Sequence, residues 1–179
     1  MRLVIVHHGD AVGPEVDPRR PLSQWGREAV ERLAAYAATR QVKPAVIWHS
    51  GKLRAKETAE AFWRACNPFA EFSATRDLQP GDPPEWIRDR LRGESRDILI
   101  AGHYPHLPRL LTLLLTAGPD QPPPRLRRSA EAFAKAERPG LREGEPVPFP
   151  QHGVVALVTE DAGETWRELW RMSSAEGAR

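Results

Sequence analysis

The chain has 179 residues, of which 40% are hydrophobic, and its formal net charge is +2. This length fits one domain with a sizeable core, and no basic run of the kind that marks a nucleic-acid-binding surface is present. The single cysteine, Cys66, excludes an intramolecular disulfide and suits a reducing compartment. Because neither a signal peptide nor an apolar stretch of about 20 residues is found, we expect a cytoplasmic protein without nucleic-acid or membrane partners.

The first half of the chain alternates short apolar segments with amphipathic ones. Residues 3–6 and 45–48 are apolar throughout, which is typical of central parallel strands that are buried on both faces. Helical spacing predicts helices over 23–38, with Ser23 as the N-cap, and over 53–65. The residues expected on the inner face of the first helix are Trp25, Ala29, Leu33 and Tyr36.

The middle of the chain continues this alternation. A proline-rich bend at residues 80–84 precedes a short predicted helix over 85–91. The apolar segment 97–101 predicts a third strand, and residues 107–115 form a strongly apolar helix.

The last third of the chain has a different composition. Residues 116–150 are rich in proline and predict a loop-like insertion, with one short helix over 129–137. Residues 153–159 and 166–172 favour two strands that pair as an antiparallel hairpin. Together the elements predict an α/β fold, a three-layer sandwich with a mostly parallel central sheet flanked by helices, as a single domain over residues 1–179.

Histidines follow three of the predicted strands. The segments are His7-His8-Gly9, His49-Ser50-Gly51 and Gly102-His103. Because ligands of open α/β sheets bind beyond the carboxyl ends of the strands, we expect these imidazoles to meet at one site. Gly9 would let a ligand approach the backbone there.

Two arginines near predicted helix starts indicate what this site binds. Arg54 combines a fixed charge with the free N–H groups of a helix N-terminus, and Arg20 lies shortly before another helix. Both features favour a phosphate. A neutral imidazole that faces a phosphoryl group can attack phosphorus and form a covalent phosphohistidine.

Four motifs occur in the order in which they occur in a known family. The sequence resembles the histidine phosphatase superfamily (phosphoglycerate mutase-like), most closely its small SixA-type phosphohistidine phosphatases. The family's R-H-G, R-P-L-[ST]-x-x-G, S-P-x-x-R-A-x-x-T and G-H-x-P correspond here to His7-His8-Gly9, Arg20-Pro21-Leu22-Ser23-Gln24-Trp25-Gly26, Ser50-Gly51-Lys52-Leu53-Arg54-Ala55-Lys56-Glu57-Thr58 and Gly102-His103-Tyr104-Pro105.

The resemblance implies a role for each of these positions. His8 would be the nucleophile, Arg54 and His103 would bind the transferred phosphoryl group, and Arg20 would assist on the phosphate side. It implies a metal-independent hydrolase without a cofactor, acting on a phosphorylated protein or a small phosphate. Family members that cleave phosphate esters use an acidic residue from a variable loop as proton donor, and Asp82 is the candidate here.

Position 7 departs from the family pattern, because His7 stands where the family has arginine. A histidine is shorter, has one donor toward a phosphate and is only partly protonated near neutral pH. Losing a charge-assisted contact to a transition state costs about 3 kcal/mol, or roughly a hundredfold in rate. We therefore expect a weakened phosphatase whose activity falls as pH rises, because a bound phosphate would help to protonate His7.

Several alternatives remain open at this point. The chain could be a binding module that holds phosphate or phosphohistidine without turnover. A metal site built from the histidines is disfavoured, because adjacent residues on an extended segment point to opposite faces, which would separate His7 from His8. His49 and Ser50 are expected to support the loop, whereas His106 and His152 are expected to be structural or solvent-facing, with a minor role for His152 left open. Arg19 could replace Arg20 as the phosphate contact.

Overall fold

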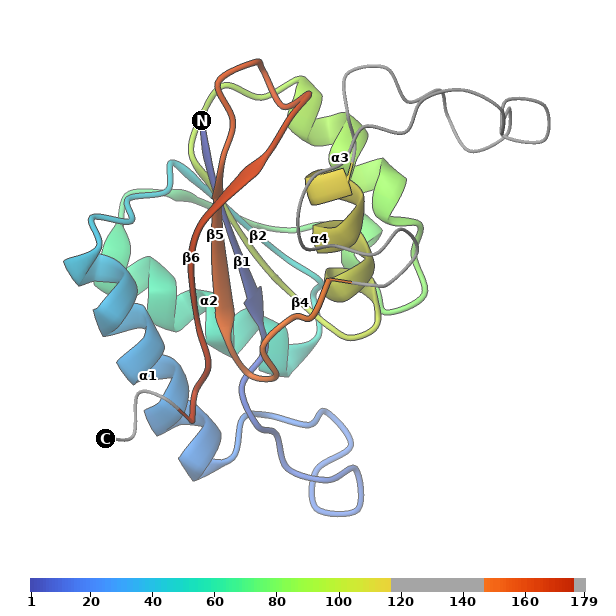
Figure 1. The fold of residues 1–179 in the computed structure, drawn as a ribbon. Helices are drawn as coiled ribbons and strands as arrows, with labels where there is room; N and C mark the ends of the chain where they lie inside the picture. Colours follow the sequence, from blue (N-terminus) through green and yellow to red (C-terminus); the bar gives the residue numbers. More distant parts are fainter. Residues whose placement is uncertain (117–146, 176–179) are drawn as a thin grey trace.

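The computed structural model describes residues 1–116 and 147–175 and contains a six-stranded sheet with helices on both faces (Figure 1). The strands are β1 (Arg2–His7), β2 (Val46–His49), β3 (Glu71–Ala74), β4 (Ile98–Gly102), β5 (Val154–Val158) and β6 (Arg167–Met172). The helices are α1 (Gln24–Thr39), α2 (Leu53–Cys66), α3 (Pro84–Arg92) and α4 (His106–Thr116), with a short 3-10 helix η1 (Arg76–Leu78). The expected α/β sandwich is confirmed, whereas the helix expected over 129–137 lies outside the described residues.

The order of strands in the sheet is β3-β2-β4-β1-β5-β6. Strands β1, β2, β3 and β4 are parallel, so their carboxyl ends share one edge of the sheet. The expected hairpin is confirmed as well, because β5 pairs antiparallel with both β1 and β6. An antiparallel strand runs the other way, so the beginning of β5 lies at the edge where the parallel strands end.

Alternate residues of β1 divide the core into two layers. Leu3 and Ile5 pack on one face in a cluster with buried residues of α3 and α4. Val4 and Val6 pack on the other face in a cluster with buried residues of α1 and α2. This alternation follows from the period of two in a strand, and it makes β1 apolar throughout because both faces are covered. The central strands are therefore held rigidly from both sides.

Helix α1 begins as expected but presents a different face to the core. The hydroxyl of Ser23 accepts a hydrogen bond from the Gly26 N–H at 2.9 Å, which is an N-cap contact. Trp25 is 53% exposed, so its predicted place on the inner face is wrong. The reason is Gly26, which packs against the loop after β1 so closely that a Cβ atom there would lie 2.1 Å from the Asp10 carbonyl oxygen. With Gly26 turned inward, its neighbour Trp25 faces solvent.

Strand β3 is not predicted by the sequence. Residues Glu71–Ala74 extend the sheet by pairing in parallel with β2 at its outer edge. Only Phe72 of this strand is half-buried, and the other three residues are exposed. An exposed edge strand carries neither the apolar run nor the alternation that marks a strand in a sequence.

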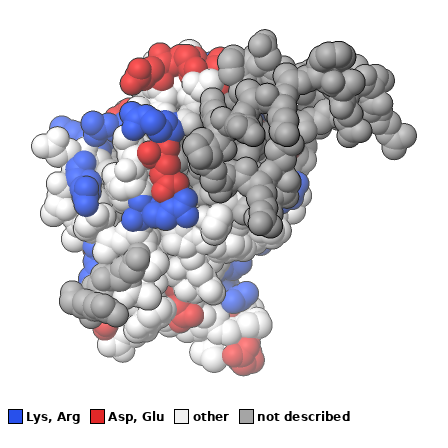
Figure 2. All heavy atoms as spheres, in the orientation of Figure 1, with Lys and Arg blue, Asp and Glu red and all other residues white. Residues whose placement is uncertain are grey.

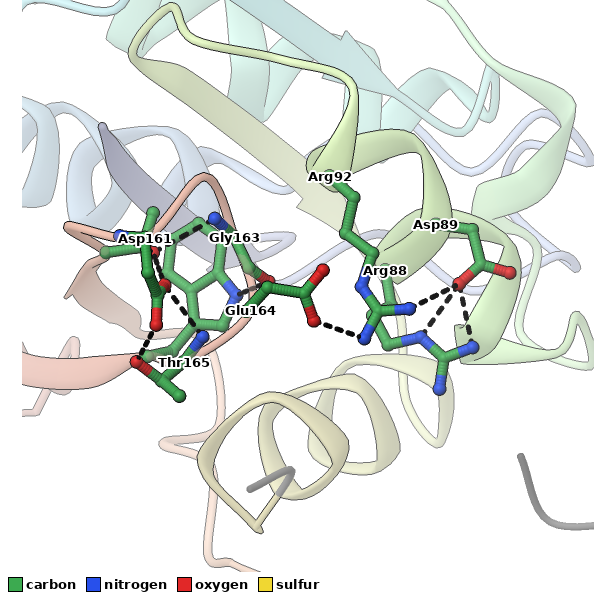
Figure 3. Close-up of polar contacts among 9 residues, drawn as sticks. Arg88, Asp89, Arg92, Asp161, Gly163, Glu164 and Thr165 are labelled. Atoms are coloured by element: carbon green, nitrogen blue, oxygen red, sulfur yellow. Dashed lines mark hydrogen bonds and ion pairs between the residues drawn. The ribbon is translucent and has the colours of Figure 1, made fainter. Parts of the chain in front are cut away.

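The end of the sheet far from the carboxyl edge is closed by polar contacts between the β5–β6 turn and α3. Figure 3 shows Glu164 of the turn facing Arg92 of α3, with a hydrogen bond of 2.8 Å between Nη2 and Oε2. Within the turn, Asp161 accepts hydrogen bonds from the Thr165 N–H at 2.9 Å and from the Thr165 hydroxyl. The turn is therefore fixed in shape and tied to the helix layer.

The face of the molecule in Figure 2 carries basic and acidic side chains next to one another. Ion pairs among the described residues join such neighbouring side chains, for example Arg171 with Glu168 and Arg96 with Glu94. Among the described residues no helix has both the length and the apolar character needed to cross a membrane.

Candidate active site

Four imidazoles gather at the carboxyl edge of the sheet. The ring centroids of His7 and His8 are 4.5 Å apart, and His103 lies 4.9 Å from His8. The fourth ring, His152, stacks on His7 at 5.0 Å with an interplanar angle of 13°. These residues follow or end β1, follow β4 and precede β5, so the strand order delivers them to one place.

The hydrogen bonds of His8 determine which of its nitrogens is free to react. Nδ1 lies 2.7 Å from the Gly9 carbonyl oxygen, which can only accept, so Nδ1 carries a proton. Nε2 accepts a hydrogen bond from Nε–H of Arg54 at 3.1 Å, so Nε2 carries a lone pair. Burial lowers the pKa of His8 to about 4. The charge of Arg54 contributes to this lowering, and the hydrogen bond to the Gly9 carbonyl oxygen opposes it. His8 is therefore a neutral imidazole with a basic nitrogen on the side of Arg54.

Arg54 is held against His8 by its place in the first turn of α2 and by a bridge through Thr58. The Thr58 hydroxyl donates to the Arg54 carbonyl oxygen at 2.7 Å and accepts the Gly9 N–H at 3.1 Å. This bridge joins α2 to the loop after β1. It gives the threonine of the third motif a physical role, because it fixes the spacing between the guanidinium and the imidazole.

His103 follows β4 and is 2% exposed. Its Nε2 lies 2.6 Å from the Ser50 hydroxyl, and the Ser50 carbonyl oxygen accepts the side-chain amide of Gln79 at 2.6 Å. Burial is the main cause that lowers the pKa of His103 to about 3, and the neighbouring His8 and Arg54 contribute to the same shift. Ser50 thus contacts His103 directly. The sequence analysis missed Gln79, which holds Ser50 in place and for which no motif gives a signal.

His7 does not behave as the sequence predicts. It is 5% exposed, and its Nδ1 accepts the backbone N–H of His152 at 2.9 Å. Burial, with the neighbouring rings of His8 and His152, lowers its pKa to about 2. Without a ligand His7 is therefore neutral near pH 7, unlike the partly protonated histidine that the sequence predicts. Its protonation by a bound phosphate, and with it an activity that falls as pH rises, stays a prediction. The bond from His152 leaves the proton on Nε2, so His7 offers one neutral donor.

The structure distinguishes the two candidate arginines of the loop before α1. Arg19 is paired with Asp17 at 3.1 Å, and its side chain is 78% exposed. Arg20 is half-buried, has a φ of 53° and donates from Nε to the Val12 carbonyl oxygen at 3.3 Å. The charge of Arg20 is among the causes that lower the pKa of both His8 and Arg54. The guanidinium near the imidazoles is therefore that of Arg20.

Two other predicted residues lie at the margin of this cluster. Asp82 accepts the Gln79 N–H at 2.7 Å within its own loop, and its charge acts on the buried His106. His49 is 5% exposed, accepts the Gly51 N–H at 3.1 Å and packs on the Phe72 ring at 4.9 Å. The role of Asp82 as proton donor stays a prediction, and His49 has the contacts of a supporting residue.

Gly51 marks a second departure from the family pattern, which has proline at this position. Its φ is 83°, an angle that proline cannot adopt, and its N–H donates to His49. The turn from β2 into α2 therefore has a shape of its own in this chain. It still places Ser50 and Arg54 on the side of the imidazoles.

His152, expected from the sequence to be structural or solvent-facing with a minor role left open, lies in this cluster. Its Nδ1 lies 2.7 Å from the His8 carbonyl oxygen, and its N–H is bonded to His7. The sequence leaves a minor role open because His152 precedes a strand whose start could border the site. Its ring lies 5.9 Å from that of His8, so it does border the cluster, and its role there stays a prediction.

The same cluster contains the nitrogen ligands that a metal ion would need. One ring nitrogen each of His7, His8 and His152 lie within 4.8 Å of one another. The expectation that strand geometry separates His7 from His8 is wrong, because β1 ends at His7 and the next residue turns toward it. A metal ion is nevertheless disfavoured, because Nδ1 of His7 already accepts the His152 N–H and the charge of Arg54 beside His8 would repel a cation.

The charge of the cluster favours an anion. Arg54 and Arg20 carry permanent positive charges, whereas burial keeps His7, His8 and His103 neutral at pH 7. Phosphate oxygens are suited to such a set of guanidinium and N–H donors. The arrangement can therefore hold a phosphoryl group next to a nucleophilic nitrogen.

Solved structures with the same fold include phosphatases and a phosphoglycerate mutase. The protein histidine phosphatase SixA complexed with tungstate superposes with a TM-score of 0.73 over 98% of each chain, at 20% identity. Mycobacterial glucosyl-3-phosphoglycerate phosphatase gives 0.60 at 14% identity, covering 96% of this chain and 99% of its own. Phosphoglycerate mutase from Plasmodium falciparum superposes with a TM-score of 0.59 at 16% identity, over 98% of this chain and 91% of its own.

Sequence comparisons give no counterpart to these structural matches. No family model and no curated protein matches this chain. At identities of 20% and below, the structural matches establish the fold. The phosphoglycerate mutase-like fold expected from the four motifs is thereby confirmed.

Proposed function

We propose that this protein is a phosphatase of the histidine phosphatase type, which hydrolyses phosphohistidine in a protein or a small phosphomonoester. His8 is the nucleophile and becomes phosphorylated on Nε2 during turnover. Arg54, Arg20 and His103 bind the phosphoryl oxygens. The tungstate complex of SixA, which has the same fold, supports an oxyanion site in this type of protein.

The observation that carries this proposal is the tautomer of His8. With Nδ1 bound to the Gly9 carbonyl oxygen, the lone pair is on Nε2, 3.1 Å from the Arg54 guanidinium. A nucleophile and a fixed cation on one side of the ring are what an attack on a phosphate dianion needs. Burial lowers the pKa of His8 to about 4, which keeps this nitrogen unprotonated near neutral pH.

The reaction follows in two displacements. Nε2 of His8 forms a bond to phosphorus while the bond from phosphorus to the leaving oxygen or nitrogen breaks, and the leaving group takes up a proton. Water then attacks the phosphorus of phosphorylated His8, loses a proton and releases phosphate and the free imidazole. Arg54 and Arg20 balance the charge on the equatorial oxygens in both steps, which is where most of the catalysis of phosphoryl transfer arises.

Position 7 and the leaving group favour phosphohistidine as the substrate. His7 supplies one neutral N–H where the family has a charged two-pronged arginine, so the site stabilises less charge in the transition state. A substrate whose leaving group departs easily suits such a site, and a protonated imidazole is a better leaving group than an alkoxide. The site would therefore work better on a phosphoramidate than on an alkyl ester.

A panel of substrates tests this function. The wild-type protein and His8→Ala are incubated with a histidine-phosphorylated protein, a phosphorylated sugar and 4-nitrophenyl phosphate, each with and without EDTA. We expect the wild type to release phosphate from at least one substrate, fastest from phosphohistidine, and EDTA to change the rate less than twofold. The activity of His8→Ala should be more than about a thousandfold lower than that of the wild type.

The same panel distinguishes the alternative of a binding module. A binder would retain phosphate or phosphohistidine in equilibrium dialysis without releasing product, and His8→Ala would weaken its affinity only moderately. Full activity in His8→Ala would contradict the assignment of the nucleophile. Loss of activity in EDTA that zinc restores would contradict metal independence and point to the three-histidine cluster.

A further inference from the structure

The reaction proposed above needs a group that moves protons, and the acidic candidate from the sequence has other contacts. The leaving group must gain a proton in the first displacement, and the attacking water must lose one in the second. The Asp82 carboxylate accepts the Gln79 N–H at 2.7 Å, and the Asp82 N–H donates to the Gln79 carbonyl oxygen at 3.1 Å. These bonds close a tight turn and direct the carboxylate to its own loop.

A different titratable side chain lies beside the nucleophile. His152 immediately precedes Gly153 and strand β5, which pairs with β1. One of its ring nitrogens lies within 4.8 Å of a ring nitrogen of His8. A tetrahedral phosphoryl group is comparable in width to this separation, so both rings can face the same bound phosphoryl group. The ring is half-buried, so protons can also reach it from solvent.

The hydrogen bonds of His152 leave its other nitrogen available for proton exchange. Nδ1 lies 2.7 Å from the His8 carbonyl oxygen, so Nδ1 is the donor of this bond and keeps its proton. Nε2 is then the nitrogen that gains or loses a proton. Imidazole is the side chain best suited to exchange protons near neutral pH.

The backbone of His152 is held in an unfavourable conformation by the same contacts. Its φ is 47°, in the left-handed region that non-glycine residues seldom adopt. The bonds from its N–H to His7 and from its ring to the His8 carbonyl oxygen maintain this conformation. Strain of this kind is concentrated at functional sites, where the surrounding structure compensates for it.

We propose that His152 is a catalytic residue, the general acid and base of the reaction; this rests on the function proposed above. In the first displacement Nε2–H of the imidazolium gives its proton to the leaving atom as the bond from that atom to phosphorus breaks. In the second, Nε2 takes a proton from the water whose oxygen bonds to phosphorus while the bond from phosphorus to His8 breaks. The imidazolium is thereby restored, and no further reactant is needed.

The groups shown in contact with His152 come from the end of β1 and the residue after it. The ring of His152 lies 5.0 Å from that of His7 and 5.9 Å from that of His8, and its backbone N–H donates to Nδ1 of His7. Among the described residues no hydrogen bond joins His152 to a carboxylate, since its bonds go to His7 and to the His8 carbonyl oxygen.

The matched variant for a test is His152→Asn. Asparagine tolerates the left-handed backbone better than most residues, and its side-chain amide can still donate to the His8 carbonyl oxygen. It cannot exchange a proton. The variant therefore removes the proposed chemistry and retains the backbone N–H that binds His7.

The experiment measures kcat/KM of the wild type and of His152→Asn with two esters of different leaving-group basicity, 4-nitrophenyl phosphate and an alkyl phosphate. We expect a loss of about a hundredfold or more for the alkyl phosphate and less than about threefold for 4-nitrophenyl phosphate, whose leaving group needs no proton. Equal losses for both esters would overturn the proposal, because a purely structural role does not depend on the leaving group. A wild type that neither turns over nor becomes phosphorylated would instead overturn the proposed function.

Discussion

A polar side chain lies near each end of strand β5, and different physical effects determine the charge of the two side chains. Beyond its first end lies His7, whose pKa is lowered to about 2 by burial. Beyond its other end, Asp161 has a pKa lowered to about 2 by hydrogen bonds from Thr165. Burial keeps the histidine neutral, whereas hydrogen bonds on the surface keep the carboxylate charged. The first environment leaves neutral imidazoles near Arg54, and the second fixes the shape of a turn.

This difference explains where chemistry can occur in the molecule. At the turn, Asp161 has partners for both carboxylate oxygens, and Glu164 is paired with Arg92 (Figure 3). At the carboxyl edge, the buried imidazoles have no carboxylate among their hydrogen-bond partners. The polar groups of the turn already bond to one another, so few donors or charges are available to a ligand. The neutral imidazoles beside Arg54 and Arg20 can still bind an anion.

After His8→Ala, the largest effect on activity at the carboxyl edge is expected from Arg54→Gln. Removing a permanent charge 3.1 Å from the nucleophilic nitrogen should lower kcat/KM by about 10²–10³-fold. Arg64→Gln is the matched control, because Arg64 is an exposed residue in the last turn of the same helix, and its activity should stay within twofold. Equal losses in both variants would mean that Arg54 acts through the stability of α2 rather than at the site.

His7→Arg tests whether position 7 faces the phosphoryl group. The substitution restores the family's charged two-pronged donor in place of one neutral N–H, so kcat/KM for phosphate esters should rise about tenfold or more. His7→Gln, which keeps a neutral donor, should stay closer to the wild type. An unchanged rate in folded His7→Arg would show that His7 does not occupy the position of the family arginine.

The contrast between the two ends of β5 also predicts how stability depends on pH. His7, His8 and His103 have native pKa values of about 2 to 4, below the value of 6.5 for a free imidazole. Between pH 6.5 and about 4 the unfolded state therefore binds more protons, and the free energy of unfolding falls as pH decreases. The slope is at most about 1.4 kcal/mol per pH unit for each group, and less for half-buried His8.

Urea unfolding at pH 7, 6 and 5 measures this slope. His8→Asn should reduce the slope, because it removes one of the groups that resist protonation. Asp161→Asn should leave the slope above pH 5 unchanged, because the stabilising effect of that carboxylate is lost only as pH falls below about 3.8 toward 2. A wild-type stability that is flat from pH 7 to pH 5 would mean that the imidazoles are not buried as described.

The smallest effect is expected from Asp82→Asn. The amide oxygen can still accept the Gln79 N–H, so the loop should keep its shape. With His152 as proton donor, kcat/KM for an alkyl phosphate should change less than about threefold. A hundredfold loss for that ester would restore Asp82 as the acid that the sequence suggests.

The sequence predicts the parallel part of the fold and site well for a physical reason. Residues 3–6, 45–48 and 98–101 are apolar because these strands are covered on both faces, and the residues after them lie at one edge because parallel strands share a direction. That rule is enough to bring His8, Ser50 and His103 together. Motif spacing adds Arg54, since it places that residue in the first turn of the helix that follows.

The remaining features depend on packing that no local pattern records. Strand β3 is exposed at the edge, and Trp25 faces solvent because Gly26 approaches the Asp10 carbonyl oxygen. The neutral state of His7 follows from burial beneath neighbouring rings. His152 enters the site only because β5 runs antiparallel to β1, a property of the sheet rather than of its own sequence neighbours.

The most direct measurement for the whole account is the location of the phosphoryl group during turnover. The wild-type protein is mixed with substrate, stopped in alkali to preserve phosphohistidine, digested and mapped by mass spectrometry, with phosphorus NMR to identify the nitrogen. The account predicts one phosphoryl group on Nε2 of His8, because Nδ1 is held by the Gly9 carbonyl oxygen. A phosphoryl group on His7, His103 or His152, or turnover without any phosphorylated histidine, would contradict it.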